Sequence, residues 1–188
     1  MAPACPPSEE SILASLASFY GSGQLCGLGE RLGVDDATTS RIAAAALPAL
    51  VIALARAAAS PSGARSLLDS IARGHDEAIF DAVAAERIQL QARLARHLDF
   101  DAAPVSGIVD LLASVVREAV ERARRAHGWE AVDLAGGLGA ECVLAEDLLP
   151  GCVGAFEELL EPESDVDLPP DDDVSALGAE LLRRLAER

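Results

Sequence analysis

Leu32-Gly-Val-Asp-Asp-Ala37 opens the stretch of sequence that decides the fold, and it returns 66 positions later as Leu98-Asp-Phe-Asp-Ala-Ala103. Downstream of each copy, Ser40-Arg-Ile42 is answered by Ser106-Gly-Ile108, and Leu54-Ala-Arg56 by Val120-Glu-Arg122. In each copy an aspartate, Asp35 or Asp101, stands at the expected N-cap of a helix, and the apolar residue before it can act as a hydrophobic staple. The repetition predicts a compact, pseudo-symmetric helical domain built from two related halves, about residues 28–60 and 94–126.

The composition indicates that the whole chain is α-helical. Of its 188 residues, 51% are hydrophobic and only 3% are aromatic, and alanine is the commonest type. Small side chains that favour helices, with few β-branched runs, are typical of closely packed helices rather than sheets. The predicted helix over about 36–58 is apolar on nearly every side, which indicates a buried central helix even though it contains Pro48.

Periodicity and capping signals divide the chain into segments. We predict a flexible N-terminus over residues 1–9, a helical domain over 10–161, an acidic linker over 162–173 and an amphipathic C-terminal helix over 174–188. Helical patterns inside the domain cover about 10–19, 24–32, 36–58, 61–74, 75–83, 84–97 and 102–126. The glycine run Gly136-Gly-Leu-Gly139 is followed by two shorter helical patterns that end near Glu161.

The C-terminal helix is the candidate docking element of the chain. Its apolar residues share one side, and an isolated helix this short needs a surface to lie on. The candidate docking residues are Val174, Leu177, Leu181, Leu182 and Leu185. Two alternatives remain open at this point: the helix binds a partner, or it folds back onto its own body.

Charge is distributed unevenly and excludes some kinds of partner. The net charge is −16, and residues 126–182 contain fifteen acidic residues and no basic one. Such a surface repels nucleic-acid phosphates and anionic lipids, so we expect no nucleic-acid binding. The uncharged run between Arg41 and Arg56 is shorter than the roughly 20 residues that a membrane span needs, and the N-terminus lacks the features of a signal peptide. We therefore expect a cytoplasmic protein with no membrane span.

No catalytic constellation, cofactor motif or metal site is expected. His75, His97 and His127 fall at predicted helix ends, where capping or solvated roles are common. Cys142 and Cys152 lack the spacing of a zinc site, so buried thiols are the expected state. The glycine run lacks the preceding strand and the lysine of a phosphate-binding loop.

Several motifs resemble a known bacterial family. They are Leu28-Gly-Glu-Arg-Leu-Gly-Val-Asp-Asp36, Ala45-Ala-Leu-Pro-Ala-Leu50, Ser60-Pro-Ser-Gly-Ala-Arg-Ser-Leu-Leu-Asp69 and Gly74-His-Asp76. At these separations, residues 10–139 resemble the YidB-like proteins, or domain of unknown function 937. The resemblance implies an all-helical bacterial protein of no established activity, and it transfers no site residue.

These observations favour a non-enzymatic protein–protein interaction or assembly module, which could bind a protein partner or a second copy of itself. The alternative is a small-molecule or lipid carrier, with a cavity between the helical halves near Pro48. An enzyme ranks third among the three hypotheses, because no group of residues in the sequence meets the requirements of an active site.

Overall fold

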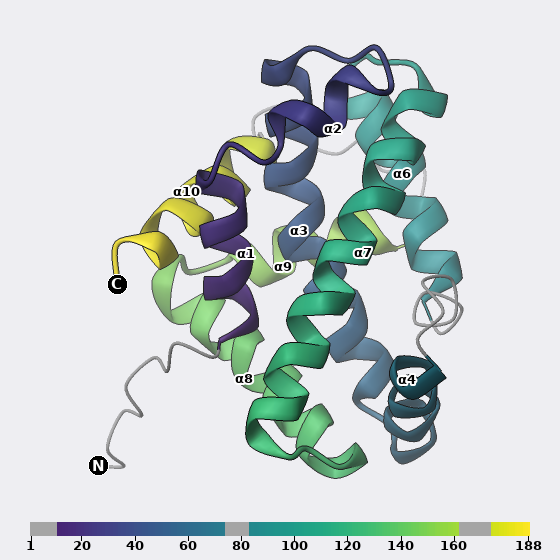
Figure 1. Ribbon diagram of the computed structural model, residues 1–188, viewed down its shortest axis with the longest axis vertical. Coiled ribbons are helices and arrows are strands. Elements are labelled where there is room, and N and C mark those ends of the chain that lie inside the picture. The colour runs from purple at the N-terminus through teal and green to yellow at the C-terminus, as the bar shows by residue number, and fades with distance from the viewer. Residues whose placement is uncertain (1–10, 74–82, 162–173) are drawn as a thin grey trace.

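The computed structural model describes residues 11–73, 83–161 and 174–188. These ranges contain nine helices and no strand, which confirms the predicted all-α fold (Figure 1). The predicted flexible N-terminus, the short helix that begins at His75 and the acidic linker lie outside the described residues. The helices are α1 (Ile12–Gly21), α2 (Cys26–Glu30), α3 (Asp36–Ala58), α4 (Pro61–Arg73), α6 (Ala84–His97), α7 (Ala102–His127), α8 (Ala131–Leu148), α9 (Cys152–Leu160) and α10 (Val174–Ala186).

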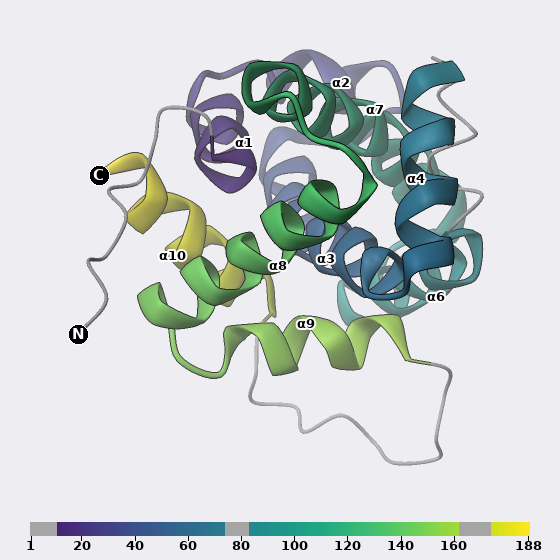
Figure 2. The ribbon, with the colours of Figure 1, turned by 90° about the horizontal axis from the view of Figure 1, so that it is seen from below.

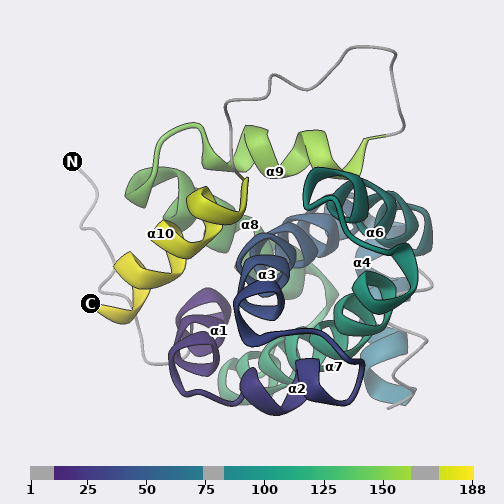
Figure 3. The same ribbon diagram turned by 90° about the horizontal axis from the view of Figure 1, so that it is seen from above.

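Helix α3 is the centre of the structure. It contacts each of the other eight described helices, and Figure 3 shows them arranged around it. Every residue from Ile42 to Leu54 is buried, as the sequence predicts for a helix without a polar face. By length and composition α3 is the one described helix that could cross a membrane, although other helices cover most of it here.

The two predicted N-caps differ in the structure. Asp35 behaves as expected: its carboxylate accepts hydrogen bonds from the Thr38 amide at 2.9 Å and the Thr38 hydroxyl at 2.7 Å. These bonds from Thr38 lower the pKa of Asp35. Asp101 is the N-cap residue of α7, as predicted, but its side chain makes no capping hydrogen bond to the first turn of α7, all of which is described. Pro104 lies in that turn and has no N–H to offer.

The turn before each long helix nevertheless has the same backbone in both copies. Gly33 has a φ of 71°, and Asp99, at the equivalent position, has a φ of 51°. The next residue donates its N–H to the carbonyl five positions back, at 3.0 Å in the first copy and 2.9 Å in the second. Glycine adopts this left-handed conformation freely and aspartate tolerates it. The recurrence is local, and pseudo-symmetry of the complete halves stays a prediction.

The glycine run lies inside helix α8 rather than before it, which corrects the predicted order of elements. Leu134 and Leu138 are fully buried on the inner side of α8, so tertiary packing overrides the low helix propensity of the glycines. Gly137 also has a packing role, because a Cβ atom there would lie 2.4 Å from the Trp129 ring. Figure 2 shows α8 running across the lower face of the molecule between α9 and α7.

Candidate functional site

The predicted docking residues of the C-terminal helix lie in the core of the same chain. Val174, Leu181, Leu182 and Leu185 are buried and Leu177 is partly buried. Helix α10 packs mainly on α3 and α1 (Figures 1 and 3). The Arg184 guanidinium also donates a 2.6 Å hydrogen bond to the carbonyl at the C-terminal end of α8. The sequence left open whether this helix binds a partner or folds back onto its own body. In the structure, it folds back onto its own body.

A close backbone contact joins α10 to the proline-containing part of α3. Pro48 has no N–H, so the carbonyl of Ala44, four residues earlier, loses its normal helical partner. Gly178 of α10 lies against this carbonyl, and a Cβ atom at Gly178 would be only 1.9 Å from the Ala44 oxygen. The Gly178 backbone therefore occupies the position next to the freed oxygen, in the manner of the Cα–H···O contacts seen between packed helices.

A buried carboxylate that the sequence reasoning did not single out joins α8 to α1. Glu141 is 7% exposed. Its carboxylate accepts hydrogen bonds from the Ser11 hydroxyl at 2.9 Å and from the amides of Ile12 at 2.8 Å and Leu13 at 3.1 Å. Ser11 in turn accepts from the Ala14 amide at 3.2 Å. Together the two side chains satisfy the three amides at the start of α1 that have no partner within the helix.

The hydrogen bonds of this carboxylate tie α8 to α1. Within the described residues, its hydrogen bonds go to Ser11 and to the first turn of α1, where the helix dipole favours a negative charge. One signal in the sequence could have marked it: Glu141 is the only charged residue between Asp133 and Glu146 in an otherwise uncharged run.

The described histidines lie at helix ends, and of the two thiols Cys152 is buried, as expected, whereas Cys142 is only partly buried. His97 and His127 occupy the last turns of α6 and α7, and the His127 ring stacks on Trp129 with 5.1 Å between ring centroids. Burial, helped by nearby glutamates, raises the pKa of the Cys142 and Cys152 thiols to about 11. Within the described residues, no group of three or more His, Cys, Asp or Glu side chains could hold a metal ion.

One face of α8 is apolar and exposed, and we call it the α8 face. It consists of Val132, Gly136, Gly139 and Val143, which lie on one side of the helix. The exposed fractions of Val132 and Val143 are 82% and 61%, the two highest among the exposed large apolar residues of the described chain. A Cβ atom at Gly136 or Gly139 would meet no atom within 4 Å. Unlike Gly137, these two glycines are therefore not explained by packing within the described chain.

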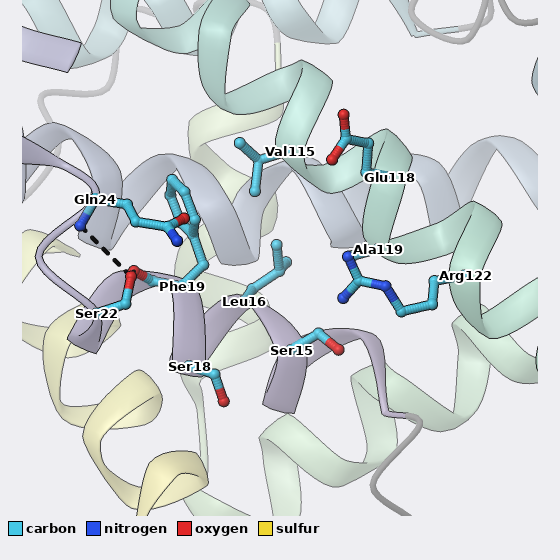
Figure 4. A pocket seen from close by; sticks show the side chains of 10 residues that line it. All are labelled: Ser15, Leu16, Ser18, Phe19, Ser22, Gln24, Val115, Glu118, Ala119 and Arg122. Carbon is cyan, nitrogen blue, oxygen red and sulfur yellow. Dashed lines mark hydrogen bonds between the residues drawn. The ribbon is translucent and has the colours of Figure 1, made fainter. Parts of the chain in front are cut away.

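A groove of about 380 Å³ runs between α1 and α7, as Figure 4 shows. Its apolar lining comes from Leu16 and Phe19 of α1 and from Val115 and Ala119 of α7. Polar side chains from both sides surround this lining. They are Ser15, Ser18, Ser22, Gln24, Glu118 and Arg122.

The space beside Pro48, where the sequence suggested a ligand cavity, is closed. It is lined by Pro48 and Val51 of α3, by Leu13 of α1 and by Glu141 and Cys142 of α8, among others, and it does not admit a water molecule. Neighbouring helices fill the space that the small side chains of α3 leave. This gives the carrier hypothesis no cavity at the predicted position.

Comparison with known proteins finds one family model that is similar to part of the chain. No curated protein and no solved structure matched the chain. A family model did match, over residues 14–92, which run from α1 into α6. The α8 face and helix α7 lie outside the matched residues. The family is described as bacterial protein of unknown function (DUF937), and this match confirms the resemblance expected from the sequence for that part of the chain.

Proposed function

We propose that the protein is a non-enzymatic protein–protein interaction module whose contact surface is the α8 face. The observation that carries the proposal is the pair of open glycines between two exposed valines. Each glycine inside a helix costs about 1 kcal/mol relative to alanine. No packing contact within the described chain requires glycine at these positions. The absence of side chains at Gly136 and Gly139 would, however, let a partner backbone approach closely.

We infer the chemistry of the partner from the surroundings of the α8 face. Asp133, Glu146 and Asp147 are exposed on the same helix, and no basic residue occurs between residues 126 and 182. A partner surface with an apolar centre and a basic rim complements this arrangement. Two α8 faces from separate copies would instead bring acidic rims together, so this face favours a different protein over a second copy.

The C-terminal helix is not the proposed contact element in its observed position. Its apolar residues are already covered by α3 and α1. Its contribution is to complete the body that holds α8 in place, through the contact between Arg184 and the end of α8.

The proposal is tested by site-specific photo-crosslinking in bacterial cells. A photoreactive amino acid at Val143 should give a discrete adduct with another protein, identified by mass spectrometry, and one at exposed Arg41 serves as the control. Adding Gly139→Leu should abolish the Val143 adduct while leaving the circular dichroism spectrum unchanged, because leucine has open space there. An adduct that persists with leucine at position 139, or that forms equally from position 41, would refute the assignment.

Light scattering on the purified chain gives the complementary result. The proposal expects a monomer over the micromolar range. A stable dimer that Gly139→Leu disrupts would show that the α8 face binds a second copy and that the argument from acidic rims is wrong.

A further inference from the structure

The groove between α1 and α7 contains three polar side chains that the fold does not use. Within the described residues, Ser15, Gln24 and Arg122 have no side-chain hydrogen bond or ion pair. All three can donate hydrogen bonds. Two other hydroxyls of the groove are committed to their own helix, because Ser18 donates to the Ala14 carbonyl at 3.0 Å and Ser22 to the Phe19 carbonyl at 2.7 Å.

Arg122 is left unpaired because the nearest glutamates on its helix are engaged or turned away. Glu121 accepts from Arg124 at 2.7 and 3.1 Å and from Arg125 at 2.5 Å. The Arg124 guanidinium is the main cause of the lowered pKa of Glu121. Glu118, one turn before Arg122, is a natural partner by spacing. In Figure 4, however, its carboxylate is directed away from α1, whereas the Arg122 side chain extends toward the middle of the groove.

Between the polar side chains, the floor of the groove is apolar. Leu16 is fully buried and Ala119 nearly so, and Phe19 and Val115 are partly buried beside them. Helix α1 has no charged residue between Ile12 and Gly21, so the acidic character of the chain as a whole does not extend to this wall. The groove thus combines an apolar surface with the exposed and unpaired Arg122 guanidinium, two neutral donors and, at its edge, the Glu118 carboxylate.

We infer that this groove binds a small amphipathic monocarboxylate. The Arg122 guanidinium holds the carboxylate through paired N–H donors, a geometry that arginine provides and lysine does not. Ser15 and Gln24 offer further donors, and the hydrocarbon part lies on Leu16, Phe19 and Val115. A volume of about 380 Å³ is at the small end of ligand sites, so the ligand has on the order of ten non-hydrogen atoms. For a ligand of that size, we expect a Kd around the millimolar range.

The test is an NMR titration of the ¹⁵N-labelled full chain with octanoate. We expect saturable shift changes at amides of α1 and α7 that line the groove and at the Gln24 side-chain amide. Arg122→Gln should weaken binding by roughly tenfold or more, because it removes the charged donor. Arg125→Gln, on the same helix but paired with Glu121, is the matched control and should leave the Kd unchanged.

Octanol separates recognition of the carboxylate from simple apolar binding. We expect it to give much smaller shifts than octanoate at the same concentration. Three results would overturn the inference: no saturable shift in the groove with octanoate, equal affinity for octanol, or an Arg122→Gln variant that binds as tightly as the natural chain. None of them bears on the α8 face, which lies on a different helix and is tested with a protein partner.

Discussion

Replacing Gly178 by alanine should destabilise the protein, although alanine is the better helix former. A Cβ atom at this position would lie 1.9 Å from the carbonyl oxygen of Ala44 and 2.6 Å from its carbonyl carbon. Ordinary carbon–oxygen contacts between helices are about 3.3–3.6 Å. Both partners are backbone atoms, so no side chain can rotate away and α10 must move off α3 by roughly an ångström or more.

The expected magnitude follows from two opposing contributions. Removing a glycine from a helix interior contributes up to about 1 kcal/mol of stability. Overpacking a tight contact costs typically about 1–3 kcal/mol and occasionally more, and displacing α10 also loosens the packing of Leu181 and Leu182. The clash should dominate, giving a net loss of about 1–3 kcal/mol. For a chain of this size, that corresponds to a Tm lower by roughly 2–12 °C.

Gly136→Ala is the matched control, because the same substitution on α8 meets no atom within 4 Å. It should leave the free energy of unfolding unchanged or raise it by up to about 1 kcal/mol. Thermal and urea unfolding, followed by circular dichroism, measure both variants. If Gly178→Ala is as stable as the natural chain, or if the two variants shift in the same direction, the close contact between α10 and Pro48-containing α3 is not as described.

Three further predictions concern single side chains. Glu141→Ala removes three hydrogen bonds at the start of α1 and should lower the urea-unfolding free energy by roughly 2–4 kcal/mol; a loss below about 1 kcal/mol would show that these bonds do not hold α8 and α1 together. Asp35→Ala should lower the Tm by roughly 2–4 °C while Asp101→Ala leaves it unchanged, and equal effects would disprove the difference between the caps. Because the pKa of Asp35 is lowered in the folded state, the difference between Asp35→Ala and the natural chain should shrink as the pH falls below the ordinary aspartate range. With the other two cysteines replaced by serine, Cys142 and Cys152 should react slowly with Ellman's reagent at pH 8 and rapidly in urea, and stability should fall as the pH rises from about 9 to 11, since their folded pKa is about 11.

Elements specified by neighbouring residues could be predicted from the sequence alone. The start of α3 at Asp36 follows from the Asp35 cap, and its complete burial follows from the absence of a polar face. Asp101 stands at the predicted N-cap of α7 but makes no capping bond. The third residue of that helix is Pro104, which has no N–H, where α3 has Thr38, so this difference is also local.

The glycine run shows how tertiary contacts override a local signal. Isolated glycines favour a break, yet the buried Leu134 and Leu138 hold α8 helical through Gly136 and Gly139. The groove between α1 and α7 also could not be predicted from the sequence, because it depends on which side chains of two distant helices meet. No spacing along the chain connects Arg122 with Gln24.

By itself, the sequence determined that the protein is all-helical, which helix lies at its centre and that its C-terminal helix must cover an apolar face. Capping residues, hydrophobic periodicity and local composition carry this information, because each reflects interactions among residues close together in the sequence. Only the tertiary structure decided what covers that face. Helix α10 packs its apolar residues on α3 and α1 of its own chain, and Gly178 fits against the carbonyl that Pro48 frees. A hydrophobic pattern shows that a face is buried, but it does not identify the surface that covers it. The same holds for Glu141, whose partners lie about 130 residues away.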